Sequence, residues 1–439
     1  MKNQICLAGM LAIFTLNLFG QTKKPAAANF TKYVDPYIGT GFHGHVFVGA
    51  SVPFGAVQLG PTNLSEGWDW SSGYHISDST IIGFQHTHLS GTGIGDLGDI
   101  SFMPTTGAIK VVKGTIENLK NGYTSLFSHE DEVVKPGYYK VKLKRYDIGV
   151  ELTASTRVGM HKYTFPASKE AHVVIDLKEG IGWDESSETY IKQVDQHTIE
   201  GYRFSNGWAE SQRIYFTAVF SKPIKSFTVY DDSTQKLGNE LKGKKVKGVL
   251  SFQTFKEEIV YVKVGISPVS TANALLNIKA EIPKWDFNKV IQDADQAWNK
   301  QLAKIDIKTD SLTQMKKFYT AFYHTMIAPS IFNDVNGEYW GTDKKVHKNT
   351  RFNNVTTFSL WDTYRANNPL FTIIQPNHVH DMINSMLAIY QQQGTLPVWH
   401  LMANETNTMP GNSALPAVAD ALLKGYKGFD TKLAYEALK

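Results

Sequence analysis

Short stretches of alternating apolar and polar residues recur from Tyr33 to about Ser270. Alternation with a period of two places every second side chain on one face, as a half-buried strand requires. Turn pairs such as Pro136-Gly137 and Asn206-Gly207 separate these stretches. Many short strands with this spacing predict an antiparallel β-sandwich over residues 33–270. The clearest expected strands cover residues 139–143, 160–165, 172–177, 214–220, 227–229, 249–255 and 259–264.

After Ser270 the apolar period changes to that of a helix. Expected helices cover residues 271–278, 287–305, 311–327, 377–393 and 413–423, with Ser311 as an N-cap and Gly394 at a C-cap position. We assign residues 271–310 to a helical linker and 311–439 to a helical domain. Asp430 can cap one more helix, which reaches Lys439 without a stop signal. The pattern therefore predicts a helical domain of which these residues form only the first part.

The N-terminus has the pattern of an export signal. Lys2 precedes an apolar run, and Gly20-Gln21 is a suitable cleavage point. We expect a signal peptide at 1–20, a tether at 21–32, and a periplasmic or extracellular protein. The run is too short to span a membrane. The net charge of +4 has no long run of one sign, so a nucleic-acid partner is not expected.

Residues 33–100 concentrate glycine, histidine, aromatic and aspartate residues on short, turn-rich segments. Two His-x-His pairs occur here, His43/His45 and His86/His88. Residues two apart on a strand face one side, so each pair could offer two imidazoles to a metal. The pairs could equally order loops or bond sugar hydroxyls. Without a further ligand at fixed spacing, we assign no metal-binding residue.

Trp68, Trp70, Tyr74 and His75 follow one another on a Gly/Ser-rich segment, GWDWSSGYH. Such rings either plug a loop against the sandwich or form a stacking platform for a sugar. In SLWDTYR, Asp362 and Arg365 lie one turn apart; they could bind vicinal hydroxyls or form an internal ion pair.

Glu405 lies between two expected helices, in LPVWHLMANETNTMPG. Glu405 could act as a general acid or base, as a substrate ligand or as a capping carboxylate. Capping and loop ordering are favoured.

These motifs, together with YVDPYIGTGFHGHVFVGASVPFGAVQL and GFQHTHLSGTGIGDLGDI, resemble glycoside hydrolase family 92. The resemblance runs from Tyr33 to the end of the chain. It implies an exported, calcium-dependent α-mannosidase with an N-terminal β-sandwich followed by an (α/α)6 barrel. It also implies an inverting reaction, with an acid and a base on opposite sides of the glycosidic bond. The family's EGN-type, Asp-rich and HEP-type motifs, which hold the acid, the base and the calcium ligands, do not occur before Lys439.

By resemblance, Asp362 corresponds to a glycone-binding aspartate and Trp68 to a tryptophan on the leaving-group side. Ala403, before Asn404, and Phe42, before His43, stand where the family more often has glycine.

The sequence thus predicts an α-mannosidase that acts on N-glycans or mannan, and α-1,2 is the linkage we expect it to cleave. Its predicted substrate-binding or site-supporting residues are Trp68, His75, Asp362, Arg365 and Glu405. One alternative is a carbohydrate-binding protein without catalysis, and another is a histidine-based metallohydrolase.

Overall fold

The computed structural model describes residues 29–439. The predicted signal peptide lies outside the described residues, as do residues 21–28 of the predicted tether. Among residues 29–439, no helix combines the length and the apolar character that a membrane crossing needs.

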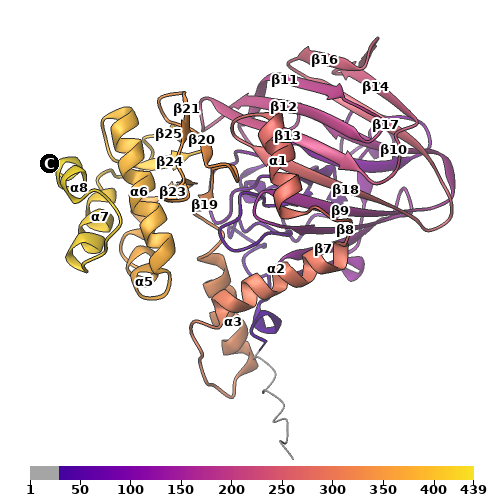
Figure 1. Cartoon of the computed structure of the whole chain (residues 1–439). Coiled ribbons are helices and arrows are strands. Elements are labelled where there is room, and N and C mark those ends of the chain that lie inside the picture. The colour runs from indigo at the N-terminus through magenta and orange to yellow at the C-terminus, as the bar shows by residue number, and fades with distance from the viewer. Residues whose placement is uncertain (1–28) are drawn as a thin grey trace, which may run out of the picture.

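Two antiparallel sheets form most of the described N-terminal half (Figure 1). The seven-stranded sheet has the order β1 (Gly60–Thr62), β3 (Gly83–Gln85), β4 (Ser101–Thr106), β10 (Ser168–Asp176), β17 (Val246–Thr254), β14 (Ser226–Asp231) and β15 (Thr234–Lys236). The nine-stranded sheet has the order β16 (Glu240–Gly243), β11 (Glu185–Gln193), β12 (Thr198–Asn206), β13 (Gln212–Phe220), β18 (Glu258–Ser267), β9 (Val158–Phe165), β8 (Ile148–Ala154), β7 (Tyr138–Leu143) and β6 (Val133–Lys135). Short β2 (Thr80–Ile81) and β5 (Ser125–Leu126) pair separately. The predicted β-sandwich is confirmed.

The sandwich core lies between the two sheets, where alternate side chains from both meet. Phe102 of β4 packs near Phe216 of β13, and both rings are fully buried. Strand β12 turns polar side chains toward the core and aromatic ones away from it. Arg203 and Ser205 are buried, whereas Tyr202 and Phe204 are only half-buried. An arginine inside the sandwich is costly unless it is paired, so its partners are of interest for the site.

Three helices follow β18, the last strand of the sandwich. Helices α1 (Thr271–Glu281), α2 (Phe287–Leu302) and α3 (Leu312–His324) begin at Ser270, Asp286 and Ser311, whose side chains accept from backbone N–H groups in the first turn. Helix α1 packs on β13 and β18, across the outer face of the nine-stranded sheet (Figure 1). Helix α2 ends at Leu302, three residues earlier than expected.

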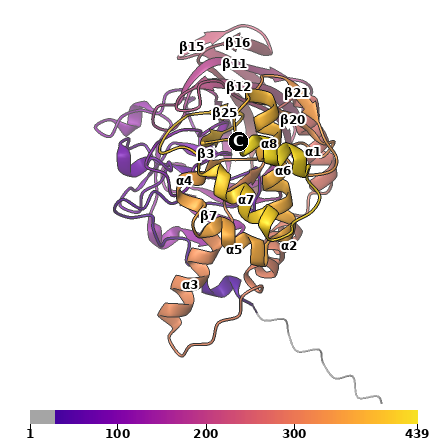
Figure 2. The same cartoon turned by 90° about the vertical axis from the view of Figure 1, so that its left-hand side faces the viewer.

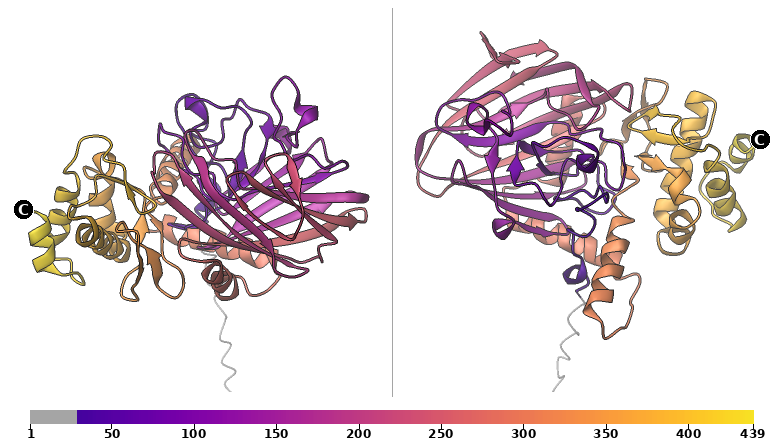
Figure 3. Two further views of the ribbon diagram at one scale, coloured as in Figure 1. Left: turned by 90° about the horizontal axis from the view of Figure 1, so that it is seen from above. Right: turned by 180° about the vertical axis from the view of Figure 1, so that it is seen from behind.

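A second helical group lies beside the sandwich, and its last helices stand farthest from it (Figures 1 and 3). In Figure 2 this group faces the viewer. It contains α4 (Leu360–Thr363), α5 (Asn367–Ile374), α6 (Pro376–Gln393), α7 (Ala414–Leu423) and α8 (Thr431–Ala437). Between these helices and the sandwich lie β19 (Ser330–Ile331), β20 (Glu338–Trp340), β21 (Val346–Lys348), β22 (Val355–Thr356), β23 (Phe358–Ser359), β24 (Trp399–Leu401) and β25 (Asn404–Glu405). The sequence predicted neither α5 nor these short strands.

Buried polar side chains fasten the helices and the strands beside them to the sandwich. Fully buried Trp298 of α2 donates from Nε1 to the Ser51 carbonyl (2.6 Å). The buried carboxylate of Asp334 accepts from Ser267 at the end of β18 (2.7 Å), and from Asn273 (2.9 Å) and Asn277 (2.7 Å) of α1. Burial raises the pKa of Asp334. Because these donors satisfy the carboxylate, the junction is held by hydrogen bonds as well as by apolar packing.

Candidate functional site

Trp68 opens a short 3-10 helix, η2 (Trp68–Trp70), on the loop that leads away from β1. Its indole Nε1 donates to the Gly93 carbonyl (2.8 Å), and its ring lies 4.8 Å from His43 and 4.5 Å from His45. The side chain is nevertheless 57% exposed. One edge of the indole is therefore fixed while much of its surface stays open, as a stacking platform requires.

The histidines around this tryptophan are each held by a neighbour. His43 Nδ1 lies 2.6 Å from Asp69 Oδ1, at the surface. His45 is buried and contacts Ser71 Oγ (2.8 Å), and burial lowers its pKa. His75 contacts Ser77 Oγ (2.7 Å) and lies 4.9 Å from the Trp70 ring. These imidazoles orient the loop and leave polar edges beside Trp68.

The second His-x-His pair belongs to the interior. His86 Nδ1 lies 2.7 Å from the Ile100 carbonyl, and His88 Nδ1 lies 2.8 Å from the Gln58 carbonyl. Burial lowers the pKa of His86 to about 3 and that of His88 to about 4, so both are neutral at pH 7. Across residues 29–439, no three His, Cys, Asp or Glu residues are grouped so that they could hold a metal.

A buried charge cluster supports the loop that holds Trp68. Arg203 Nη1 donates to Asp99 Oδ1 (2.9 Å), its Nη2 donates to Asp184 Oδ1, and its Nε donates to the Leu177 carbonyl (3.1 Å). All three charged side chains are fully buried. Asp99 also accepts from Thr87 (2.6 Å). Loop 91–99, which contains Gly93, is thus tied to the sandwich interior.

Asp96 adds a third carboxyl group to this cluster. It accepts from its neighbour Leu97 N (2.6 Å) and from Ala209 N (2.8 Å), across the loop after β12. Burial, together with the nearby charge of Asp184, raises the pKa of Asp96 to about 7. The cluster was not predicted from the sequence. Two features could have indicated it: the repeated Gly-Asp pattern of GIGDLGD, and the arginine at position 203 within a half-polar strand.

The loop around β24 and β25 meets the sandwich through two indoles. Trp399 lies 4.1 Å from Trp208, whose Nε1 donates to Thr408 Oγ1 (2.8 Å). Glu405 Oε1 accepts from Trp399 N (2.9 Å) and Asn407 N (3.0 Å), while Oε2 accepts from Val398 N (2.9 Å).

Three backbone donors on one carboxylate make Glu405 an organiser of this loop. That is the role the sequence favoured for it.

Asp362 and Arg365 lie on and just after α4, and both are exposed. Asp362 accepts from Ser359 Oγ (2.5 Å), and Arg365 donates to the Trp361 carbonyl (3.1 Å). Each side chain therefore has its own local partner rather than the other. Their roles in substrate binding stay predictions.

The predicted site residues fall into two sets. Trp68 and His75 share one sandwich loop, whereas Asp362, Arg365 and Glu405 belong to the helical part. Within residues 29–439 no hydrogen bond, ion pair or ring contact joins one set directly to the other. The connection runs through the Asp96 bond to Ala209 and the neighbouring Trp208–Trp399 contact.

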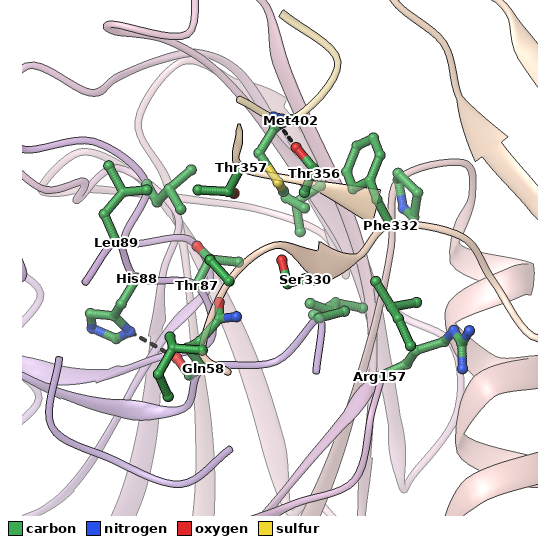
Figure 4. Close-up of a pocket in the computed structure, with 18 of the residues that line it drawn as sticks. Gln58, Thr87, His88, Leu89, Arg157, Ser330, Phe332, Thr356, Thr357 and Met402 are labelled. Atoms are coloured by element: carbon green, nitrogen blue, oxygen red, sulfur yellow. Dashed lines mark hydrogen bonds between the residues drawn. The ribbon is translucent and has the colours of Figure 1, made fainter. Parts of the chain in front are cut away.

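A small cavity also lies at this junction (Figure 4). Gln58, Thr87 and His88 line it from the sandwich, and Thr356 and Met402 line it from the other side. Its volume is about 40 Å³. One water needs roughly 10–15 Å³ of such space, so the cavity accepts a few waters and no sugar ring.

Known proteins similar to this chain are glycosidases. An alpha-mannosidase of family GH92 from Bacteroides thetaiotaomicron is 38% identical, with a TM-score of 0.91 over 93% of this chain and 57% of its own. An inverting mannosidase of the same family and organism is 25% identical, with a TM-score of 0.83 over 94% of this chain and 55% of its own.

A curated relative from Arthroderma benhamiae, called an uncharacterized secreted glycosidase, is 27% identical over 93% of this chain and 51% of its own length. The chain therefore spans about half the length of the relatives it matches.

The family itself follows from two domain matches. Residues 33–267 match the glycosyl hydrolase family 92 N-terminal domain, and residues 273–439 match the family 92 catalytic domain. The chain belongs to glycosyl hydrolase family 92, as the sequence resemblance indicated.

Proposed function

We propose that this chain is part of an exported, exo-acting α-mannosidase that removes α-1,2-linked mannose from N-glycans or mannan with inversion. The observation that carries the proposal is the exposed, edge-anchored indole of Trp68 in a chain of family 92. The similar proteins support it, because two are named mannosidases and a third is named a secreted glycosidase. A structure of the first of these enzymes holds mannoimidazole.

In this proposal the 439 residues supply substrate-binding groups. Trp68 offers a stacking face to the sugar on the leaving-group side of the bond. Asp362 offers acceptor oxygens to hydroxyls of the terminal mannose that is released. Glu405 acts by ordering the loop that carries Trp399. The acid and the base, which inversion places about 6.5–9.5 Å apart, are supplied by the (α/α)6 barrel outside these residues.

Calcium enters the proposal through the family alone. Carboxylate and carbonyl oxygens would hold such an ion. The described residues contain no group of metal-binding side chains that fits it. We therefore assign it no residue and no step here.

Mannose release is the direct test. The full-length protein, supplied with calcium, is incubated with α-1,2-, α-1,3- and α-1,6-linked mannobiose, and with β-1,4-mannobiose as a control. The first anomer released is followed by NMR. We expect mannose from an α-linked substrate, appearing first as the β-anomer. Release from none of the α-linked substrates would overturn the proposal, and the α-anomer first would overturn inversion.

The second candidate is a carbohydrate-binding protein without catalysis. It is favoured by the engagement of Glu405 with three backbone donors and of Asp362 with Ser359. An assay of the full-length protein separates the two: binding of α-mannobiose without turnover supports this candidate, and turnover excludes it.

A further inference from the structure

A second polar cavity lies on the sandwich, and two residues that flank Trp68, Gly67 and Trp70, line it. Its volume is about 350 Å³, and its walls include Gly67, Trp70, Lys113, Glu179 and Asp184. This volume lies at the lower end of the range of about 300–1,000 Å³ that small-molecule sites occupy. Unlike the junction cavity, it has room for a sugar ring.

Most charged groups that line the cavity have a partner of opposite sign. Lys113 Nζ donates to Glu66 (2.7 Å) and to Glu179 (2.9 Å). Lys178 pairs with Asp232 (3.2 Å). The third lining lysine, Lys245, is exposed. Because the lining also contains four carboxylates, Glu66, Glu179, Asp184 and Glu185, the cavity does not favour an anion. Paired donors and acceptors at a polar wall suit a neutral molecule with several hydroxyl groups.

One wall group still needs a partner. The Asp184 side chain is fully buried, and its Oδ1 accepts from Arg203. Its Oδ2, although buried, meets no hydrogen-bond partner in the described part of the chain. A buried carboxylate oxygen without a partner is costly. The side chain has no exposed surface, so this oxygen lies behind the wall and Asp184 lines the cavity through its backbone.

The cavity is continuous with the surroundings of Trp68. Gly67, at a φ of 140°, immediately precedes Trp68 and lines the cavity. The segment 180–184 is hydrogen-bonded to loop 91–99, because Trp183 N donates to the Gly95 carbonyl (3.3 Å). Gly93 of the same loop accepts from the Trp68 indole. A neighbouring depression shares Glu185 and Ser186 with the cavity and is lined by Trp183, which is 68% exposed.

We propose that this cavity is a remote subsite that binds one neutral sugar residue of the oligosaccharide whose terminal residue is cleaved near Trp68. The inference rests on the proposed function. Lys113 and Glu179 bind hydroxyl groups, and the exposed face of Trp183 carries the chain onward. Substrates of three or more sugars therefore bind more tightly than disaccharides.

The test compares a short and a long probe. Calorimetry measures the Kd of α-1,2-mannobiose and of linear α-1,2-mannotetraose on the chain and its variants; where a probe is cleaved, KM replaces Kd. Two or three added hydrogen bonds correspond to a gain of about tenfold for the tetraose.

Ser65→Trp, which fills the cavity from its rim, should remove that gain and leave the mannobiose value unchanged. Ser233→Trp, the same change on an exposed turn, is the matched control and should alter neither value. Lys113→Gln serves as a second variant with a smaller change in volume, and a loss of roughly threefold for the tetraose alone is expected.

Equal affinity for both probes in the unmodified chain would overturn the subsite, and so would a Ser65→Trp variant that folds and keeps the gain. In both cases, release of mannose from mannobiose would leave the proposed function standing. Failure of the intact protein to bind or cleave either probe would remove both proposals.

Discussion

Arg203 is the residue whose loss should disturb the candidate site most from a distance. It is the cation that faces buried Asp99 and Asp184, and it also donates to the Leu177 carbonyl. Arg203→Met keeps much of the side-chain volume and removes the charge. Asp184 then loses its bond at Oδ1, and Asp99 keeps only neutral donors such as Thr87 and Gln212.

The expected cost follows from breaking a buried ion pair on one side. Removing one partner typically costs about 3–5 kcal/mol, because it leaves an uncompensated buried charge. Burial already raises the pKa of Asp184, and removal of the Arg203 charge raises it further, so this carboxyl group can escape the cost by taking up a proton. The loss of unfolding free energy should thus be largest at pH 8 and smaller, by about 1 kcal/mol or more, at pH 5.

Urea denaturation at both pH values measures the effect. Arg213→Met is the matched control, because Arg213 lies on the neighbouring strand but on the outer face, over the Phe204 and Trp340 rings. Its loss should cost about 1 kcal/mol with no dependence on pH. Adding Asp184→Asn to Arg203→Met should restore part of the stability. A cost below about 1 kcal/mol for Arg203→Met, or one equal at the two pH values, would refute this reasoning.

Asp96, whose folded pKa of about 7 lies above its ordinary 3.8, stabilises the fold fully at low pH, and this contribution is lost as pH rises through 7. Asp96→Asn should flatten that decline, whose upper bound is roughly 4 kcal/mol, in denaturation curves taken from pH 4 to 8; an unchanged slope contradicts the assignment. Glu405→Gln should lower the free energy of unfolding by about 1–2 kcal/mol, because one amide group faces backbone donors, while kcat stays within tenfold. A kcat loss above about a hundredfold at unchanged stability would instead mark Glu405 as an acid or base. Trp68→Ala should weaken oligosaccharide binding about tenfold in calorimetry and leave the melting temperature nearly unchanged, since the ring is 57% exposed; intact affinity would remove Trp68 from the site.

The fold was predictable where burial sets the period of the pattern. Strands β7, β9 and β13, and helices α6 and α7, follow apolar periodicity closely, and Ser311 and Gly394 act as caps with their expected side-chain and backbone geometry. Strand β12 escaped because its buried face carries Gly201, Arg203 and Ser205 while its half-buried face carries Tyr202 and Phe204. Period alone cannot tell which face of such a strand is inside.

The candidate site was predictable only in its local parts. The sequence placed Trp68 and His75 on one polar loop and favoured loop ordering for Glu405, and the structure shows both. It could not show that both histidines of the second pair are neutral core groups, because the burial of His86 depends on distant strands. Nor could it reveal Arg203 beside Asp99, since partners 104 positions apart are joined by topology rather than by spacing.

Hydrogen bonds connect the buried charge cluster to the two exposed tryptophans, Trp68 and Trp183. Arg203 and Asp99 fix loop 91–99 from below, Gly93 of that loop fixes Trp68, and Gly95 fixes the loop of Trp183. Because stacking surfaces are useful only when they are held in place, rigidity at the surface must be supplied by partners in the interior. An open indole on a glycine-rich loop would otherwise lose side-chain and backbone entropy on each binding event. The three buried carboxyl groups, unfavourable on their own, are therefore best explained as the support that orders the surface around Trp68 and Trp183.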